Sequence, residues 1–370
     1  MSLLRPLLLL SFGLAACAAA AGDAAPSSDS MAALQEVQVL PGTYGSIPSA
    51  VELGDGRVAF IDGAAKLVKV GNFATGAVTD LGRRADTLPA NAPPDLYKFP
   101  GVLVHLAADT LAIVDFAATR TTLVGEDGSP RAIHVFAPIG GNTPVLHYDH
   151  LGNGYRVDYQ AILGGNEPGT PVRPDSIAIL RLKPLSGRAD TVGYFGAPTY
   201  GEARFGDAIQ QVAEIFSPND YFGVLPDGAL WVARGRSNRI DWRAPDGRWT
   251  VGTPRRYTPQ PVTEADKSRV MAQLAARGMP SNVPVSFPFA TNRPPFELAY
   301  GRADGTIWLQ RPRASETAAY VFDIWGRDGA WQKAVTLPDG VSLAGFGATA
   351  VYGARKKGEG RELVKFAVGQ

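Results

Sequence analysis

The densest group of potential metal ligands lies at residues 147–150, which read His-Tyr-Asp-His. Imidazole and carboxylate groups bind zinc and other transition metals. On a strand, His147 and Asp149 would share one face, while His150 would point to the other. Two ligands on one face do not complete a metal site, and the sequence shows no partner group. These residues are candidate metal ligands, but a polar strand edge or loop is the favoured interpretation.

A basic group forms the second candidate site. Arg234, Arg236 and Arg239 lie close together in the sequence. Planar guanidinium groups pair well with carboxylates, so these side chains are candidates for binding an anionic glycan or a peptide carboxylate. The formal net charge of the chain is only +1, which favours a solvated loop instead. The same charge balance excludes broad nucleic-acid binding, because that needs a basic excess to neutralise phosphates.

Motifs for covalent catalysis are absent from the sequence. It has no Gly-x-Ser-x-Gly nucleophile elbow, and its one cysteine is Cys17. The sequence therefore identifies no catalytic residue. The favoured function is a binding or scaffold module whose partner is an envelope protein, a peptide or a glycan, and we expect a monomer.

The N-terminus has the features of an export signal. Arg5 provides a positive charge, and the apolar stretch 3–14 is shorter than the roughly 20 residues that span a bilayer. The sequence Leu-Ala-Ala-Cys that ends at Cys17 resembles the lipobox of bacterial lipoproteins, in which the thiol takes a diacylglycerol. We therefore expect a signal peptide over residues 1–16 and a lipidated cysteine with a flexible tether over residues 17–35. A reactive cysteine, or a signal peptide cleaved elsewhere, is the alternative.

The expected anchor also predicts a location. Ala18 and Ala19 follow the cysteine, so the acidic cue that retains lipoproteins in the inner membrane is missing. By resemblance to lipoprotein sorting, we expect the outer membrane facing the periplasm, or the cell surface. The lipid on Cys17 would be the membrane contact, with the folded body in water.

The rest of the chain repeats one unit, a turn followed by a short β-rich run. In the clearest copies, 226–232 and 303–309, an Asp-Gly pair precedes an apolar run that contains a tryptophan. Asp-Gly tolerates the positive φ of tight turns, and such runs suit strands that are buried between neighbouring sheets. Six copies begin near residues 55, 109, 175, 227, 304 and 348.

This repeat predicts an all-β fold, a six-bladed β-propeller over residues 36–370. A four-stranded blade needs about 40–50 residues, and each interval between copies has room for one. An eight-stranded jelly roll is the alternative, but it would not repeat at this spacing. Residues 36–40 and 362–368 alternate apolar and polar side chains, so we expect them to pair and close the ring.

One helix is expected inside the propeller, within a proline-rich insertion at about 258–295. Thr263 can cap its N-terminus, and Val270, Met271 and Leu274 form an apolar stripe at helical spacing. The six tryptophans of the chain follow the repeat in blades four and five. We expect them to pack between blades rather than to stack on carbohydrate.

Several segments resemble a known group of proteins, and these are 81–84, 99–101, 227–232, 304–309, 320–329 and 335–338. They look like the six-bladed propeller lipoproteins of some environmental bacteria, which are loosely related to NHL-repeat propellers. The resemblance covers about residues 40–368. It implies the fold and the location rather than a chemistry, because most members of that group have no assigned activity.

A second resemblance concerns chemistry. Gluconolactonase-like hydrolases, which are also six-bladed propellers, hold a divalent cation over the central channel with Glu, Asn and Asp side chains from different blades. Such oxygen ligands suit calcium or magnesium, and Glu52, Asn219 and Asp220 are the candidates here. The alternative function is therefore a metal-dependent hydrolase or lactonase with its site at the channel mouth. The favoured interpretation of Asn219 and Asp220 is a capped turn, and no cofactor is then expected.

Overall fold

The structure is a computed structural model that describes residues 31–89, 92–106, 109–135, 145, 147–158, 175–183, 188–276 and 284–368. Contacts within the chain separate Met1–Ser30 from one compact unit, Met31–Gln370. Cys17, the expected signal peptide and most of the expected tether lie outside the described residues.

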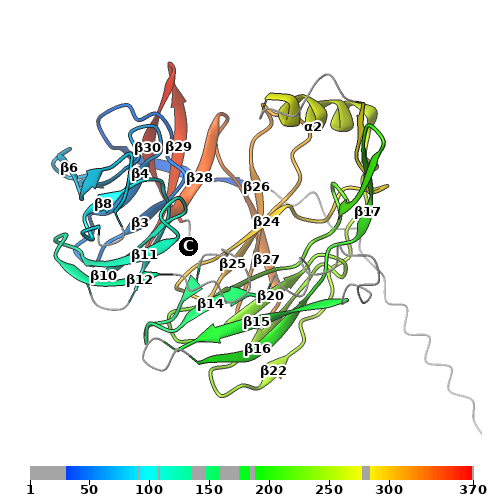
Figure 1. Cartoon of the computed structure of the whole chain (residues 1–370), viewed down its shortest axis with the longest axis horizontal. Coiled ribbons are helices and arrows are strands. Elements are labelled where there is room, and N and C mark those ends of the chain that lie inside the picture. Colours follow the sequence, from blue (N-terminus) through cyan, green and yellow to red (C-terminus); the bar gives the residue numbers. More distant parts are fainter. Residues whose placement is uncertain are drawn as a thin grey trace, which may run out of the picture. The chain divides into compact units, whose positions relative to one another are not determined.

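Four-stranded antiparallel units, the blades, follow one another along the described chain (Figure 1), and the first strands of the first and last blades also pair in parallel, which joins those two blades into one sheet. Blade one contains β3 (Ala50–Glu52), β4 (Val58–Asp62), β5 (Leu67–Gly71) and β6 (Val78–Asp80). Blade two contains β9 (Pro100–His105), β10 (Thr110–Asp115), β11 (Arg120–Gly125) and β12 (Pro130–Val135). Blade three contains β13 (His147–Tyr148), β14 (Gly154–Val157), β15 (Ser176–Leu182) and β16 (Ala189–Gly196).

The second half of the chain continues the pattern. Blade four contains β19 (Tyr221–Val224), β20 (Leu230–Arg234), β21 (Arg239–Arg243) and β22 (Trp249–Thr250). Blade five contains β24 (Leu298–Gly301), β25 (Ile307–Gln310), β26 (Val321–Trp325) and β27 (Trp331–Thr336). Blade six contains β28 (Val341–Phe346), β29 (Ala350–Lys357), β30 (Gly360–Ala367) and the N-terminal β2 (Gln35–Val39). Short strands β7 (Arg83–Arg84) and β8 (Leu96–Tyr97) pair between blades one and two.

The hydrophobic core is a cycle of clusters, one between each blade and the next. Each cluster joins apolar side chains from two consecutive sheets, for example Ile61 with Leu111, Ala112 with Tyr148, Ile177 with Leu230, Trp231 with Ile307, Trp308 with Val351, and Phe60 with Tyr352. The last pair brings blade six against blade one, so the cycle closes. The predicted all-β, six-bladed propeller with a short helical insertion is confirmed.

The Asp-Gly turns behave as their sequence predicts. Gly56, Gly228 and Gly305 adopt φ of +83°, +84° and +89°, a region that favours glycine. The copies near residues 55, 109, 227, 304 and 348 precede the second strand of their blades. The repeat predicted the same position for the copy at Asp175, and this prediction is wrong. That copy precedes β15, the third strand of blade three. Blade three turns between its first two strands at Asp149 instead, whose side chain accepts hydrogen bonds from the backbone of that turn.

The N-terminal segment closes the ring. Strand β2 pairs antiparallel with β30, from Gln35 opposite Ala367 to Val39 opposite Val364. This confirms the pairing expected from the alternating patterns at the two ends of the chain. The sequence did not predict β1 (Ala32–Ala33), which pairs parallel with β27 of blade five.

The insertion contains helix α2 (Glu264–Ala276), near its predicted position. Its first turn is a reciprocal cap, because the Thr263 backbone donates to the Asp266 carboxylate at 3.0 Å and the Asp266 backbone donates to the Thr263 hydroxyl at 3.2 Å. A hairpin between blades three and four, β17 (Tyr200–Phe205) and β18 (Ala208–Ala213), pairs with β23 (Val285–Ser286) of the insertion. None of the described helical segments has the length and apolar character of a membrane span.

Candidate functional site

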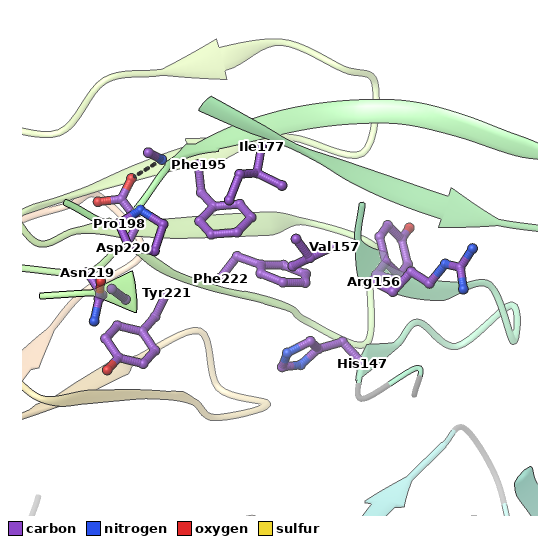
Figure 2. A pocket seen from close by; sticks show the side chains of 13 residues that line it. His147, Arg156, Val157, Ile177, Phe195, Pro198, Asn219, Asp220, Tyr221 and Phe222 are labelled. Atoms are coloured by element: carbon purple, nitrogen blue, oxygen red, sulfur yellow. Dashed lines mark hydrogen bonds between the residues drawn. The ribbon is translucent and has the colours of Figure 1, made fainter. Parts of the chain in front are cut away.

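A cavity of about 400 Å³ lies between blades three and four (Figure 2). The first strands of the two blades, β13 and β19, form part of its wall, together with the end of β14 and the adjoining ends of β15 and β16. Most of the side chains that line it are apolar or aromatic, and they include Val157, Ile177, Phe195, Tyr221 and Phe222. The cavity therefore favours an apolar body.

Aromatic contacts set the shape of the cavity. The rings of Phe195 and Phe222 stack with their centroids 6.3 Å apart, and the ring of His147 meets Phe222 edge-on at 4.8 Å. The hydroxyl of Tyr221 donates to the backbone carbonyl of Glu297 in the segment before β24. These contacts fix the aromatic walls before any ligand is present.

His147 contributes an uncharged polar group. Burial disfavours its protonated form and lowers the pKa of the imidazole to about 4. The ring is therefore neutral at physiological pH, with one nitrogen that donates and one that accepts. A cavity with mostly apolar walls and a neutral imidazole suits an organic molecule, and Arg156, Asn219 and Asp220 complete its polar lining.

Asp149 and His150, the other two candidate metal ligands of residues 147–150, contact different partners. Asp149 is buried, and its carboxylate accepts hydrogen bonds from the backbone of Leu151 and from the side chains of Asn153 and Tyr155, at 2.8–2.9 Å. His150 lies against the backbone carbonyl of Pro226 in blade four. His147, Asp149 and His150 therefore face separate surroundings.

Asn219 and Asp220 precede β19 and line the same cavity as His147. The carboxylate of Asp220 accepts hydrogen bonds from the backbone of Gly196 at 2.8 Å and of Gly235 at 2.9 Å, and it forms an ion pair with Arg234 at 2.9 Å. The Oδ1 atom of Asn219 is buried and has no hydrogen-bond partner among the described residues. A buried acceptor of this kind costs free energy until a donor reaches it.

Glu52 lies in blade one and fastens that blade to blade six. Its carboxylate accepts hydrogen bonds from the backbone of Ala348 at 2.7 Å and from the hydroxyl of Tyr352 at 3.1 Å. Lys365 approaches the same carboxylate at 3.6 Å. The structure places Asn219 and Asp220 together but gives Glu52 other partners.

These surroundings do not fit a divalent cation. The carboxylates of Glu52 and Asp220 already accept hydrogen bonds from backbone amides, and Asp220 is paired with an arginine. Across the described ranges, no three His, Cys, Asp or Glu side chains gather as a metal site would require.

Arg234, Arg236 and Arg239 line a second, smaller cavity of about 320 Å³. It shares Phe195, Gly196 and Asp220 with the first cavity, so the two adjoin. The structure thus brings the predicted basic group next to the apolar cavity. Sequence reasoning missed the aromatic walls, because Phe195 and Phe222 occur in apolar strands that look like ordinary core.

No protein-family model matches the sequence, and no curated protein matches it. Solved structures do resemble the chain. They include regucalcin, a calcium-binding protein from Agrobacterium tumefaciens, with 12% identity, 91% of this chain and 96% of that chain covered and a TM-score of 0.43. A gluconolactonase from Xanthomonas campestris has 11% identity, 93% and 99% coverage and a TM-score of 0.42. Virginiamycin B lyase from Staphylococcus aureus has 12% identity, 90% and 99% coverage and a TM-score of 0.42.

Proposed function

We propose that this protein is a ligand-binding module that takes a small organic molecule into the cavity between blades three and four. The cavity itself carries the proposal. Its volume of about 400 Å³ lies in the range of small-molecule sites, which are concave, mostly apolar and equipped with a few polar groups. Here the polar residues of the lining include the neutral imidazole of His147, together with Arg156, Asn219 and Asp220.

The lining defines what a ligand needs. The neutral imidazole of His147 offers one donor and one acceptor. The stacked rings of Phe195 and Phe222 favour a flat or branched apolar body. A compact ligand with an apolar body and one hydrogen-bond donor therefore fits this cavity best.

Obstruction of the cavity tests this function. Ala213 is an exposed residue at the end of β18 that lines the cavity, so the change Ala213→Trp would fill its opening without disturbing the buried core. With the neutral dye N-phenyl-1-naphthylamine as probe, we expect one dye per wild-type chain and about tenfold weaker binding to the variant, a loss of about 1.4 kcal/mol. Fluorescence titration measures both values.

The matched control is Ala208→Trp, which is on the same strand and also exposed but is not part of the cavity lining. It should bind the dye as the wild type does. Equal dye affinity in Ala213→Trp and Ala208→Trp would contradict the proposed site.

The hydrolase alternative makes a different prediction for the same protein. A cation that binds only the folded state raises the melting temperature. We expect EDTA, followed by calcium, magnesium, manganese or zinc, to leave the melting temperature of residues 31–370 unchanged. A fall with EDTA that one metal restores would support a metal-dependent hydrolase or lactonase and direct the next assays to lactones and esters.

We also propose that Cys17 carries a lipid that holds the propeller at the outer membrane, facing the periplasm. The Leu-Ala-Ala-Cys sequence supports this. In a bacterial host, the full chain should fractionate with membranes and incorporate labelled palmitate. The variant Cys17→Ser should lose the label and leave the membrane fraction. Membrane association of the unlabelled variant would contradict a lipid anchor.

A further inference from the structure

We infer that the ligand of this cavity is an organic anion and that Arg236 binds its charged group. This inference rests on the proposed function, because it concerns the same site and specifies the class of ligand. Three arginines meet two aspartates at the smaller cavity, which leaves one positive charge over.

Two of the three arginines are neutralised by the protein itself. Arg234 lies between two carboxylates, at 2.9 Å from Asp220 and 2.8 Å from Asp241. Arg239 pairs with the other oxygen of Asp241 at 2.9 Å. Both aspartate side chains are almost fully buried, with exposed fractions of 8% and 5%. Buried pairs of this kind are structural, and they leave no net charge for a ligand.

Arg236 is the remaining charge. Its side chain is exposed, and in the described part of the chain it has no carboxylate within ion-pair distance. Its Nη2 donates instead to two neutral acceptors, the backbone carbonyl of Ala197 at 3.2 Å and the hydroxyl of Thr199 at 3.3 Å. These bonds hold the guanidinium at the cavity while most of its donors are left for another group.

The two compartments adjoin. The apolar cavity and the arginine-lined cavity share Phe195, Gly196 and Asp220. An apolar body against Phe195 would therefore place an attached carboxylate, sulfonate or phosphate near Arg236. Asp220 lies between the two, but its pairing with Arg234 and two backbone amides offsets its repulsion of an anion.

Two dyes with the same apolar body test this inference. 1-Anilinonaphthalene-8-sulfonate carries a sulfonate, whereas N-phenyl-1-naphthylamine lacks it. We expect the wild type to bind the sulfonate dye more tightly, and we expect Arg236→Gln to weaken that binding about tenfold without changing the affinity for the neutral dye. Arg236→Lys should recover part of the loss, since it keeps the charge without the planar fork.

The control for a general loss of positive charge is Arg248→Gln. Arg248 lies in the turn between β21 and β22, where its side chain is 80% exposed and lines neither cavity. This variant should bind both dyes as the wild type does. Equal affinity of the two dyes for the wild type, or an equal loss of both in Arg236→Gln, would overturn the anion inference while cavity binding stands. Failure of both dyes to bind the wild type would overturn the proposed function and this inference together.

Discussion

A chain that begins at Pro41 should melt at least about 10 °C below a chain that begins at Met31. The truncation removes β2, the fourth strand of blade six, and leaves β30 as an open sheet edge. It also removes Leu34 and Leu40, which are 6% and 0% exposed in the clusters between blades five and six and between blades six and one. Loss of a buried leucine side chain costs about 2–5 kcal/mol, and a domain is stable by only about 5–15 kcal/mol.

Differential scanning calorimetry of the two truncated chains measures this difference. The chain that begins at Met31 serves as the control, because residues 1–30 form no part of the compact unit. Its melting temperature should equal that of the full chain. A chain from Pro41 that melts within a few degrees of the control would show that the ring is stable without its N-terminal strand.

The second large effect concerns a buried ion pair that joins the helix of the insertion to the end of the insertion. Asp266 of α2 is 1% exposed and accepts hydrogen bonds from Arg293, which is 8% exposed, and from Arg269 at 2.7 Å. The change Asp266→Ala leaves a buried guanidinium without a counter-charge, which costs about 3–5 kcal/mol. It also removes the reciprocal cap with Thr263. We expect a clear fall in the urea midpoint at pH 7.

Glu264→Gln is the matched control on the same helix. Glu264 pairs with Lys267 at 2.7 Å, but its side chain is 86% exposed, and exposed pairs contribute little. Its urea midpoint should equal that of the wild type. If Asp266→Ala were as stable as Glu264→Gln, the buried pair would not stabilise the insertion.

The effect of Asp266 should depend on pH. Burial alone would raise the pKa of this carboxyl, but hydrogen bonds from Arg293 and Thr263 and the charge of Arg293 outweigh it and hold the pKa well below its usual value. A carboxyl with a depressed folded-state pKa stabilises the fold above its unfolded pKa, near 4, and this contribution is lost as the pH falls further. The stability difference between wild type and Asp266→Ala should therefore be constant above about pH 5 and shrink below pH 4.

Local sequence was enough to predict the ring. Asp-Gly turns and short apolar runs are local signals, and they identified five of the second strands, such as β4 and β20, at their true positions. The expected packing of tryptophans between blades is confirmed for Trp231, Trp242, Trp308 and Trp325, all buried in the core clusters. Trp249 differs, with 37% exposure at the outer strand of blade four.

The cavity could not be predicted in the same way. It forms where the start of β13, the ends of β14 and β16 and the start of β19 meet, and the sequence does not say which strand ends share a face. Phe195 and Phe222 have the pattern of core residues, so nothing distinguished them from Ile179 or Val232. The arginine motif was visible, but its charge balance depends on Asp220 and Asp241, whose partners only the fold reveals.

The pairing of the N-terminal strands also determines how the protein would respond to mechanical load. A pull on residues 1–30 would reach β1 first, whose two residues are held only to β27. It would next reach the Gln35 end of β2, opposite Ala367 at the end of β30. Strands loaded from one end of an antiparallel pair separate one pair at a time, at low force. Detachment of β1 from β27 would therefore release part of the load before the load passes to β2, so that β1 would yield first under tension.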